Sequence, residues 1–182
     1  MGPSAAGLLC WLTAASSSAS VSPAERSEAA PMPLWLQLAA TRFDAVRQAL
    51  QVNDVAAFER AALRVLGLGP GLTPSGDDFV GGVFFALHHA PRSHWRAALP
   101  AVQARFRTAA ACATNVISAA LLDDLMDGHS HQALHDLLDA LHAEDPARIQ
   151  AATTAMLGIG ASSGADMLCG VVLALTTWQD TF

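Results

Sequence analysis

Two segments, each a glycine-rich loop followed by an apolar run, constrain this chain more than any other feature. The first loop, 67–78, reads GLGPGLTPSGDD and precedes the run FVGGVFFAL. The second loop, 158–166, reads GIGASSGAD and precedes MLCGVVLAL. Aligned on Ser75 and Ser163, both segments share Ser-Gly-x-Asp and then a glycine at the same place in the apolar run. One such echo predicts a pseudo-two-fold repeat.

The two apolar runs predict a pair of helices at the centre of the fold. A helix that is apolar on every side must be covered on every side. We therefore expect central helices over about 76–89, ended by Pro91, and over about 163–178. Gly82 and Gly170 would let the two backbones approach closely. The expected fold is mainly α, a helical bundle around two central apolar helices, each preceded by a Gly/Ser-rich loop, with pseudo-two-fold symmetry.

The rest of the chain also has helical periodicity. Apolar residues recur at three- and four-residue spacing, and no run of alternating β-branched residues indicates a strand. Asn53 would cap a helix that Gly67 ends, and Pro100 would restart a helix capped by Ser93. The further expected helices cover about 34–51, 53–67, 93–128, 131–143 and 145–158.

Composition narrows the class of protein. The chain has 182 residues, of which 52% are hydrophobic and 14% charged, and its formal net charge is −6. This high apolar fraction predicts that partner subunits cover part of the surface, so we expect an oligomer. The acidic balance, with no arginine cluster in the sequence, argues against nucleic acid as a partner. No apolar run approaches the ~20 residues that a membrane-spanning helix needs.

The absence of lysine limits the chemistry further. Without lysine the chain can form no Schiff base and has no Walker-type phosphate lysine, so we expect no organic cofactor. Three scattered cysteines without metal-ligand spacing indicate a reduced, cytoplasmic chain. We expect one helical domain over 33–182, preceded by a low-complexity, poorly ordered segment over 1–32.

The glycine-rich loops are candidate binding sites for a small anion. Free N–H groups at a helix start, together with the helix dipole, bind phosphate or carboxylate groups. Asp77 or Asp78 would coordinate Mg²⁺ or orient an amide nucleophile, and two carboxylates beside a phosphate imply a cation between them. In the first loop, the expected ligand groups are the N–H groups of Gly69, Gly71 and Gly76 and the hydroxyls of Thr73 and Ser75.

Residues distant in the sequence would complete this site. Ser163 and Asp166 would form its far wall. Arg105 or Arg107 would bind a substrate carboxylate through two parallel hydrogen bonds. Arginines on helices are also commonly exposed without a ligand, so both interpretations of this pair stay open.

Structural interpretations compete with the binding site. The pattern Ser-x-x-Asp, which begins at Ser75 and again at Ser163, also matches the capping box that satisfies the first N–H groups of a helix. His131 and His135 have the i, i+4 spacing of a metal-binding pair. No His-Glu-x-x-His motif accompanies them, and a solvated helix face is the better interpretation.

Three motifs together resemble the AllH-like family. The first is the complete loop at 67–78, and the second is a Thr-x-x-x-Ser element at Thr114 and Ser118. The resemblance covers about residues 55–178, and because members usually have a longer region before the glycine loop, this chain is expected to be N-terminally short. The third motif is matched by Gly160, Ser162, Ser163, Gly164, Asp166, Leu168 and Gly170.

The resemblance implies a subunit of oxamate carbamoyltransferase, an enzyme of anaerobic allantoin breakdown in purine catabolism. That enzyme interconverts carbamoyl phosphate plus oxamate with oxalurate plus phosphate, and several different subunits carry the activity. We take Asp77 and Asp78 as candidate catalytic residues. The alternative is a non-catalytic structural or metabolite-binding regulatory subunit of a multi-subunit complex. The candidate substrate-binding residues in the second and third motifs are Thr114, Ser118, Ser162, Ser163, Gly164 and Asp166.

Overall fold

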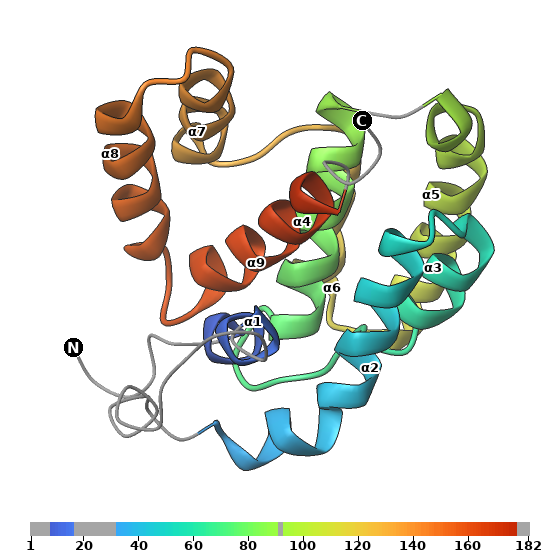
Figure 1. Cartoon of the computed structure of the whole chain (residues 1–182). Helices are drawn as coiled ribbons and strands as arrows, with labels where there is room; N and C mark the ends of the chain where they lie inside the picture. Colours follow the sequence, from blue (N-terminus) through green and yellow to red (C-terminus); the bar gives the residue numbers. More distant parts are fainter. Residues whose placement is uncertain (1–7, 17–31, 91–92, 178–182) are drawn as a thin grey trace.

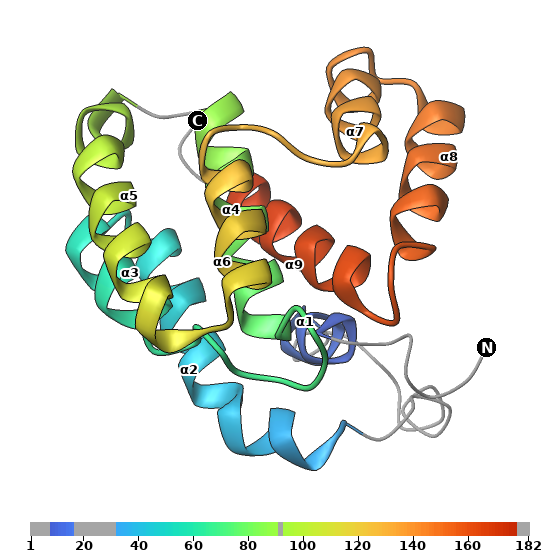
Figure 2. The ribbon, with the colours of Figure 1, turned by 180° about the vertical axis from the view of Figure 1, so that it is seen from behind.

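The computed structural model describes residues 8–16, 32–90 and 93–177, and within these ranges the chain is helical without a strand. Figures 1 and 2 show the arrangement from two opposite sides. The prediction of a mainly α fold is confirmed. The helices are α1 (Leu9–Ser16), α2 (Leu34–Gln51), α3 (Val55–Ala62), α4 (Ser75–His89), α5 (Ser93–Ala113), α6 (Val116–Met126), α7 (Gln132–His142), α8 (Pro146–Leu157) and α9 (Ser163–Thr176).

Helices α4 and α9 pack tightly against each other, and two glycines allow it. A Cβ on Gly82 would lie 2.1 Å from the carbonyl oxygen of Met167, and a Cβ on Gly170 would lie 2.0 Å from that of Phe79. Both distances are far below van der Waals contact, so only glycine fits at either position. The two contacts join equivalent positions of the two aligned segments. A pseudo-two-fold relation of the whole domain stays a prediction.

Further helix pairs make up the rest of the described fold. Helix α6 packs along α4, helices α7 and α8 pair with each other, and α2 packs against α3. In both views α7 and α8 lie at the opposite end of the ribbon from α2 and α3 (Figures 1 and 2). Aromatic rings fill the space between α3, α4 and α5, where Phe58 meets Phe84 and Trp95 edge to face at centroid distances of 5.7 and 5.3 Å. Such contacts stabilise a core beyond the area they bury.

The start of α3 differs from the prediction. Asp54, not Asn53, caps the helix, and its carboxylate accepts a hydrogen bond from the N–H of Ala57 at 2.9 Å. Asn53 instead has a φ of 57° in the tight turn after α2, and its side chain accepts a hydrogen bond from Trp95. Asparagine tolerates this left-handed conformation better than most residues. Helix α3 then ends at Ala62, ahead of Gly67.

The long helix predicted over 93–128 is two helices. Helix α5 ends at Ala113, and Asn115 caps α6 by accepting hydrogen bonds from the N–H groups of Ile117 and Ser118 at 3.1 and 3.0 Å. Pro100 lies within α5 and does not restart a helix there. The break is explained by Thr114 and Asn115, whose side chains bind the glycine-rich loop.

Helix α1 lies within the segment 1–32, and the poor order expected of that segment as a whole stays a prediction. Leu8 and Trp11 are buried, and the indole of Trp11 meets the ring of Phe79 edge to face at 5.9 Å. The sequence did not predict this helix, because its few large apolar residues are surrounded by small ones. Residues 1–7 and 17–31, and Pro91, lie outside the described residues. That 33–182 form a single domain stays a prediction.

Across the three described ranges, we find no helix whose length and apolar character would carry it through a membrane.

Candidate functional site

Asp77 anchors the glycine-rich loop from inside the protein. Its carboxylate is 2% exposed and accepts hydrogen bonds from the N–H of Gly67 at 2.7 Å, the hydroxyl of Thr114 at 2.5 Å and the hydroxyl of Ser118 at 2.6 Å. The amide of Asn115 adds a bond to the carbonyl of Leu72 at 2.7 Å. The Thr-x-x-x-Ser element therefore connects the loop to the start of α6 through Asp77. The structure uses these groups internally, where the sequence suggested substrate contacts.

One N–H group that was predicted to bind an anion is instead used within the loop. The N–H of Gly76 donates to the carbonyl of Leu68 at 2.8 Å, so it is not free for a phosphate. A Cβ on Gly76 would lie 1.8 Å from the carbonyl oxygen of Val65, which makes close backbone approach the reason for this glycine. Gly69 and Gly71 have φ values of 110° and 104°, so the path of the loop requires glycine at both. That their N–H groups bind an anion stays a prediction.

Neither Ser-x-x-Asp pattern forms a capping box in the described structure. The residues before α4 and α9 are Pro74 and Ser162, and neither helix has a side-chain hydrogen bond at its cap. Ser75 and Ser163 are each the first residue of their helix. The prediction of a capping box at these positions is therefore wrong.

The hydroxyls instead lie near residues of the opposite segment. The hydroxyl of Ser163 at the start of α9 lies 2.7 Å from that of Thr73, in the loop before α4, and it lowers the pKa of Asp78. Ser75 at the start of α4 likewise lowers the pKa of Asp166 in α9. The close packing of α4 and α9 places each helix start beside the acid of the other. Predicted site residues from both loops are thus brought together.

Asp78 is the acid of this pair that faces a pocket. Its side chain is 5% exposed, and within the described part of the chain its buried Oδ2 has no hydrogen-bond partner. Burial and, to a smaller extent, the charges of Asp166 and Asp77 raise the pKa of Asp78 to about 7, although hydrogen bonding with Ser163 and Thr73 acts in the opposite direction. Near neutral pH this carboxyl therefore exists in both protonation states.

Asp166 is the more enclosed acid. Its Oδ1 accepts a hydrogen bond from the N–H of Leu8 at 2.6 Å, and its buried Oδ2 has no partner among the described residues. Burial raises the pKa of Asp166, against the hydrogen bonds of Leu8, Ser75 and Ser162. Two carboxyls with raised pKa values therefore lie where α4 and α9 begin.

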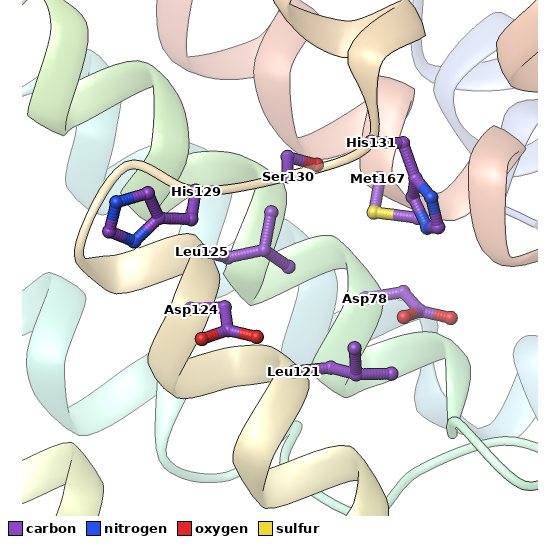
Figure 3. Close-up of a pocket in the computed structure, with 8 residues that line it drawn as sticks. All are labelled: Asp78, Leu121, Asp124, Leu125, His129, Ser130, His131 and Met167. Carbon is purple, nitrogen blue, oxygen red and sulfur yellow. The ribbon is translucent and has the colours of Figure 1, made fainter.

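The pocket beside Asp78 has a volume of about 210 Å³. Figure 3 shows Asp78, His131 and Met167 on one side, with His129 and Asp124 on the other. The buried hydroxyl of Ser130 has no hydrogen-bond partner in the described ranges. A pocket below the ~300 Å³ typical of drug-sized ligands suits a small metabolite. Its lining residues are Asp78, Leu121, Asp124, Leu125, His129, Ser130, His131 and Met167.

Sequence reasoning missed the residues that this pocket takes from 128–131. His129 and His131 are exposed, as predicted for a solvated face, but both line the pocket. His135 does not pair with His131, because its ring packs against those of Phe85 and His89. The sequence feature that could have indicated these pocket residues is the cluster of glycine, histidine and serine directly after an apolar helix.

The structure shows no cluster for a metal ion within the residues it describes, where three or more His, Cys, Asp or Glu side chains would have to meet. The oxygens of Asp77 already accept three hydrogen bonds. A Mg²⁺ ion at Asp77 and Asp78 therefore stays a proposal.

Arg105, Arg107 and Gly164 are engaged elsewhere. Arg105 forms an ion pair with Glu59, 2.7 Å between Nη2 and Oε2, and Arg107 binds Asp123 and Asp127. Neither arginine lines the Asp78 pocket. A Cβ on Gly164 would lie 1.8 Å from the carbonyl oxygen of Met156, so this glycine serves the packing of α9 against the end of α8.

Comparison with known families accounts for the motifs that build this site. A family model described as "Oxamate carbamoyltransferase subunit AllH" matches residues 65–175, which is more than half of the chain and includes the Asp77 anchor, the Asp78 pocket and both glycine-rich loops. The comparisons with curated proteins and with solved structures gave no match. The resemblance predicted from the three motifs is confirmed, and this chain belongs to the AllH family.

Proposed function

We propose that this chain is a subunit of an oxamate carbamoyltransferase and that the Asp78 pocket binds a small anionic substrate of that enzyme. The observation that carries the proposal is the Asp78 carboxyl, which is buried, has a pKa of about 7 and lines a pocket of metabolite size. The family description names oxamate and carbamoyl transfer. Helix dipoles support an anion here, because α4 and α9 both begin beside the pocket.

The pKa of Asp78 suits a proton acceptor in carbamoyl transfer. The amide nitrogen of oxamate would attack the carbamoyl carbon of carbamoyl phosphate. A C–N bond forms, the C–O bond to phosphate breaks, and phosphate leaves with the electron pair. The ionised form of Asp78 takes the proton from nitrogen and returns it to the phosphate oxygen. A pKa near the working pH gives both steps a usable fraction of the correct form.

The same pKa removes a difficulty that the sequence posed. Two ionised carboxylates would repel a phosphate and call for a cation, whereas a protonated Asp78 donates a hydrogen bond to an anion and repels nothing. The imidazoles of His129 and His131 and the hydroxyl of Ser130 offer further donors around the same space. Substrate binding in this proposal needs no metal, although Mg²⁺ is compatible with it.

Ligand-induced stabilisation of the purified chain tests the proposal. Carbamoyl phosphate, oxamate and oxalurate, each at about 100 times its dissociation constant, should raise the melting temperature by several degrees. Asp78→Ala, which removes the hydrogen-bonding group, should weaken binding at least tenfold, and Asp139→Ala, an exposed change on α7, should leave it unchanged. Equal binding by a folded Asp78→Ala variant, or no stabilisation by any of the three, would contradict the assignment.

A second function is favoured by the internal use of the motif residues. Asp77, Thr114, Ser118 and the N–H of Gly76 all spend their hydrogen bonds on holding the loop. A structural or metabolite-sensing subunit would need this loop without using it for chemistry. Turnover by the complex reconstituted with its partner subunits separates the two functions: loss of activity in Asp78→Asn supports catalysis on this chain, and full activity supports the second function.

A further inference from the structure

We propose that the outer face of α2, together with the groove between α2 and α3, binds an amphipathic helix of another protein subunit. In this docking site the apolar seam of the partner helix lies on α2, and its acidic edge meets three arginines. The site shares no residue with the Asp78 pocket, and the inference does not rest on the proposed function.

Helix α2 has a buried apolar face and an exposed stripe that carries large apolar side chains near both of its ends. Leu36, Phe43 and Val46 face the core. The exposed stripe repeats with alternating four- and three-residue steps, which is the spacing of a helix that packs along another helix. Its large apolar members are 70%, 76% and 72% exposed, in chain order. The exposed stripe consists of Leu34, Leu38, Thr41, Ala45, Gln48 and Val52.

The groove beside this stripe is positively charged. It has a volume of about 620 Å³, and Arg42, Arg60 and Arg64 line it. In the part of the chain that the structure describes, none of the three forms an ion pair. Arg42 uses one N–H for the carbonyl of Arg64 at 3.3 Å, a bond that joins α2 to the segment after α3 across the groove. Small side chains at Ala45, Ala49, Ala57 and Ala61 leave the floor open.

Charge and length together select the occupant. Three guanidinium groups in a groove that no carboxylate lines, in a chain whose net charge is −6, are complementary to an acidic partner. The stripe from Leu34 to Val52 is about 27 Å long at the rise of an α-helix. A small anion would bind the arginines and leave the leucines of the stripe exposed to water. A helix of similar length would cover the leucines and the arginine-lined groove together. A second copy of this chain docked through the same face would bring arginines against arginines.

Two synthetic peptides test the proposal directly. Both are amphipathic helices of about six turns with leucines at four- and three-residue steps. One carries glutamates beside the leucine seam, and the other carries lysines at the same positions. Fluorescence anisotropy with the full chain should show that the acidic peptide binds at least tenfold more tightly, and that its affinity falls as salt concentration rises.

Variants of exposed residues assign the binding to this face. Arg60→Glu with Arg64→Glu, and separately Leu38→Ser, should each weaken the acidic peptide at least tenfold. Arg148→Glu on α8 is the matched control and should change nothing, because this exposed arginine lies outside the groove. Circular dichroism establishes that each variant keeps its helical content.

Three results would overturn the inference. The first is equal binding of the two peptides, or binding of neither. The second is displacement of the acidic peptide by submillimolar inorganic phosphate, which would make the groove a small-anion site. The third is a dimer of the free chain, seen by sedimentation, that Leu38→Ser dissociates, because the occupant would then be a second copy.

Discussion

Replacing Gly82 with alanine tests whether the close contact between α4 and α9 holds the candidate site together. The new Cβ would lie 2.1 Å from the carbonyl oxygen of Met167 and 3.0 Å from its carbonyl carbon. Both atoms belong to the backbone of α9, so no change of rotamer relieves the overlap. The two helices must move apart by roughly 1 Å to restore ordinary contact.

The cost follows from how completely these helices are buried. Overpacking a core typically costs about 1–3 kcal/mol, and this site belongs at the upper end because every residue of α4 from Ser75 to Leu87 is buried. For a chain of this size, about 3 kcal/mol lowers the melting temperature by roughly 6–12 °C. Gly170→Ala should cost a similar amount, since its Cβ would lie 2.0 Å from the carbonyl oxygen of Phe79. The double variant should cost much less than the sum, because the first substitution already separates the helices.

Urea unfolding followed by far-UV circular dichroism measures these free energies. Gly158→Ala is the control: its φ of −82° suits alanine, it is exposed, and its nearest neighbour is the carbonyl oxygen of Ala155 at 3.3 Å. We expect its effect to lie within about 0.5 kcal/mol. A Gly82→Ala variant as stable as this control, or a fully additive double variant, would refute the reasoning.

Three further outcomes follow from the site and the core. Asp77→Asn should cost about 2–3 kcal/mol in urea unfolding, because it disrupts three hydrogen bonds of a buried side chain; a loss below about 0.5 kcal/mol, roughly the size of a surface change, would contradict the anchor role. Burial raises the pKa of Asp78 to about 7 and also raises that of Asp166. The stabilisation from these two carboxyls should therefore be complete below about pH 4, where both are protonated in the folded and unfolded states. The free energy of unfolding should fall as pH rises through 7, by up to about 4 kcal/mol for Asp78. Unfolding at a series of pH values should show this slope, and Asp78→Asn should flatten it; an unchanged slope would contradict the assignment. Trp11→Ala should lose about 3–5 kcal/mol, measured by thermal unfolding, because the indole packs on Phe79 and Phe43; an unchanged melting temperature would show that α1 does not stabilise the core.

The helices that the sequence predicted well are those whose ends depend on local patterns. The bounds of α2 follow from its apolar periodicity, and Asp145 with Pro146 marks the start of α8 as expected. The break at Thr114 could not be predicted in this way. It depends on hydrogen bonds to Asp77 and Leu72, which lie about 40 residues earlier in the chain.

The sequence predicted that the two glycine-rich loops lie close together, as the contact between Thr73 and Ser163 shows, but it did not predict how their acidic residues are used. Asp77 and Asp78 are adjacent and chemically identical, so the sequence offers no reason to separate them. Successive residues of a helix point about 100° apart, and this rotation directs Asp77 toward the start of α6 and Asp78 toward the pocket. His129 and His131 escaped prediction because the turn after α6 brings them to Asp78 from about 50 residues away.

The same long separations matter while the chain is being made. Helix α4 emerges from the ribosome with its apolar sides uncovered, and α9, which must cover one of them, is synthesised about 90 residues later. An apolar helix exposed for this interval is a target for aggregation and for chaperones. The site itself exists only after α9 has been synthesised, because Asp78 interacts with Ser163 and Asp166 across this interval. Production of the protein should therefore depend on the rate of translation and on chaperone supply more than its modest length suggests.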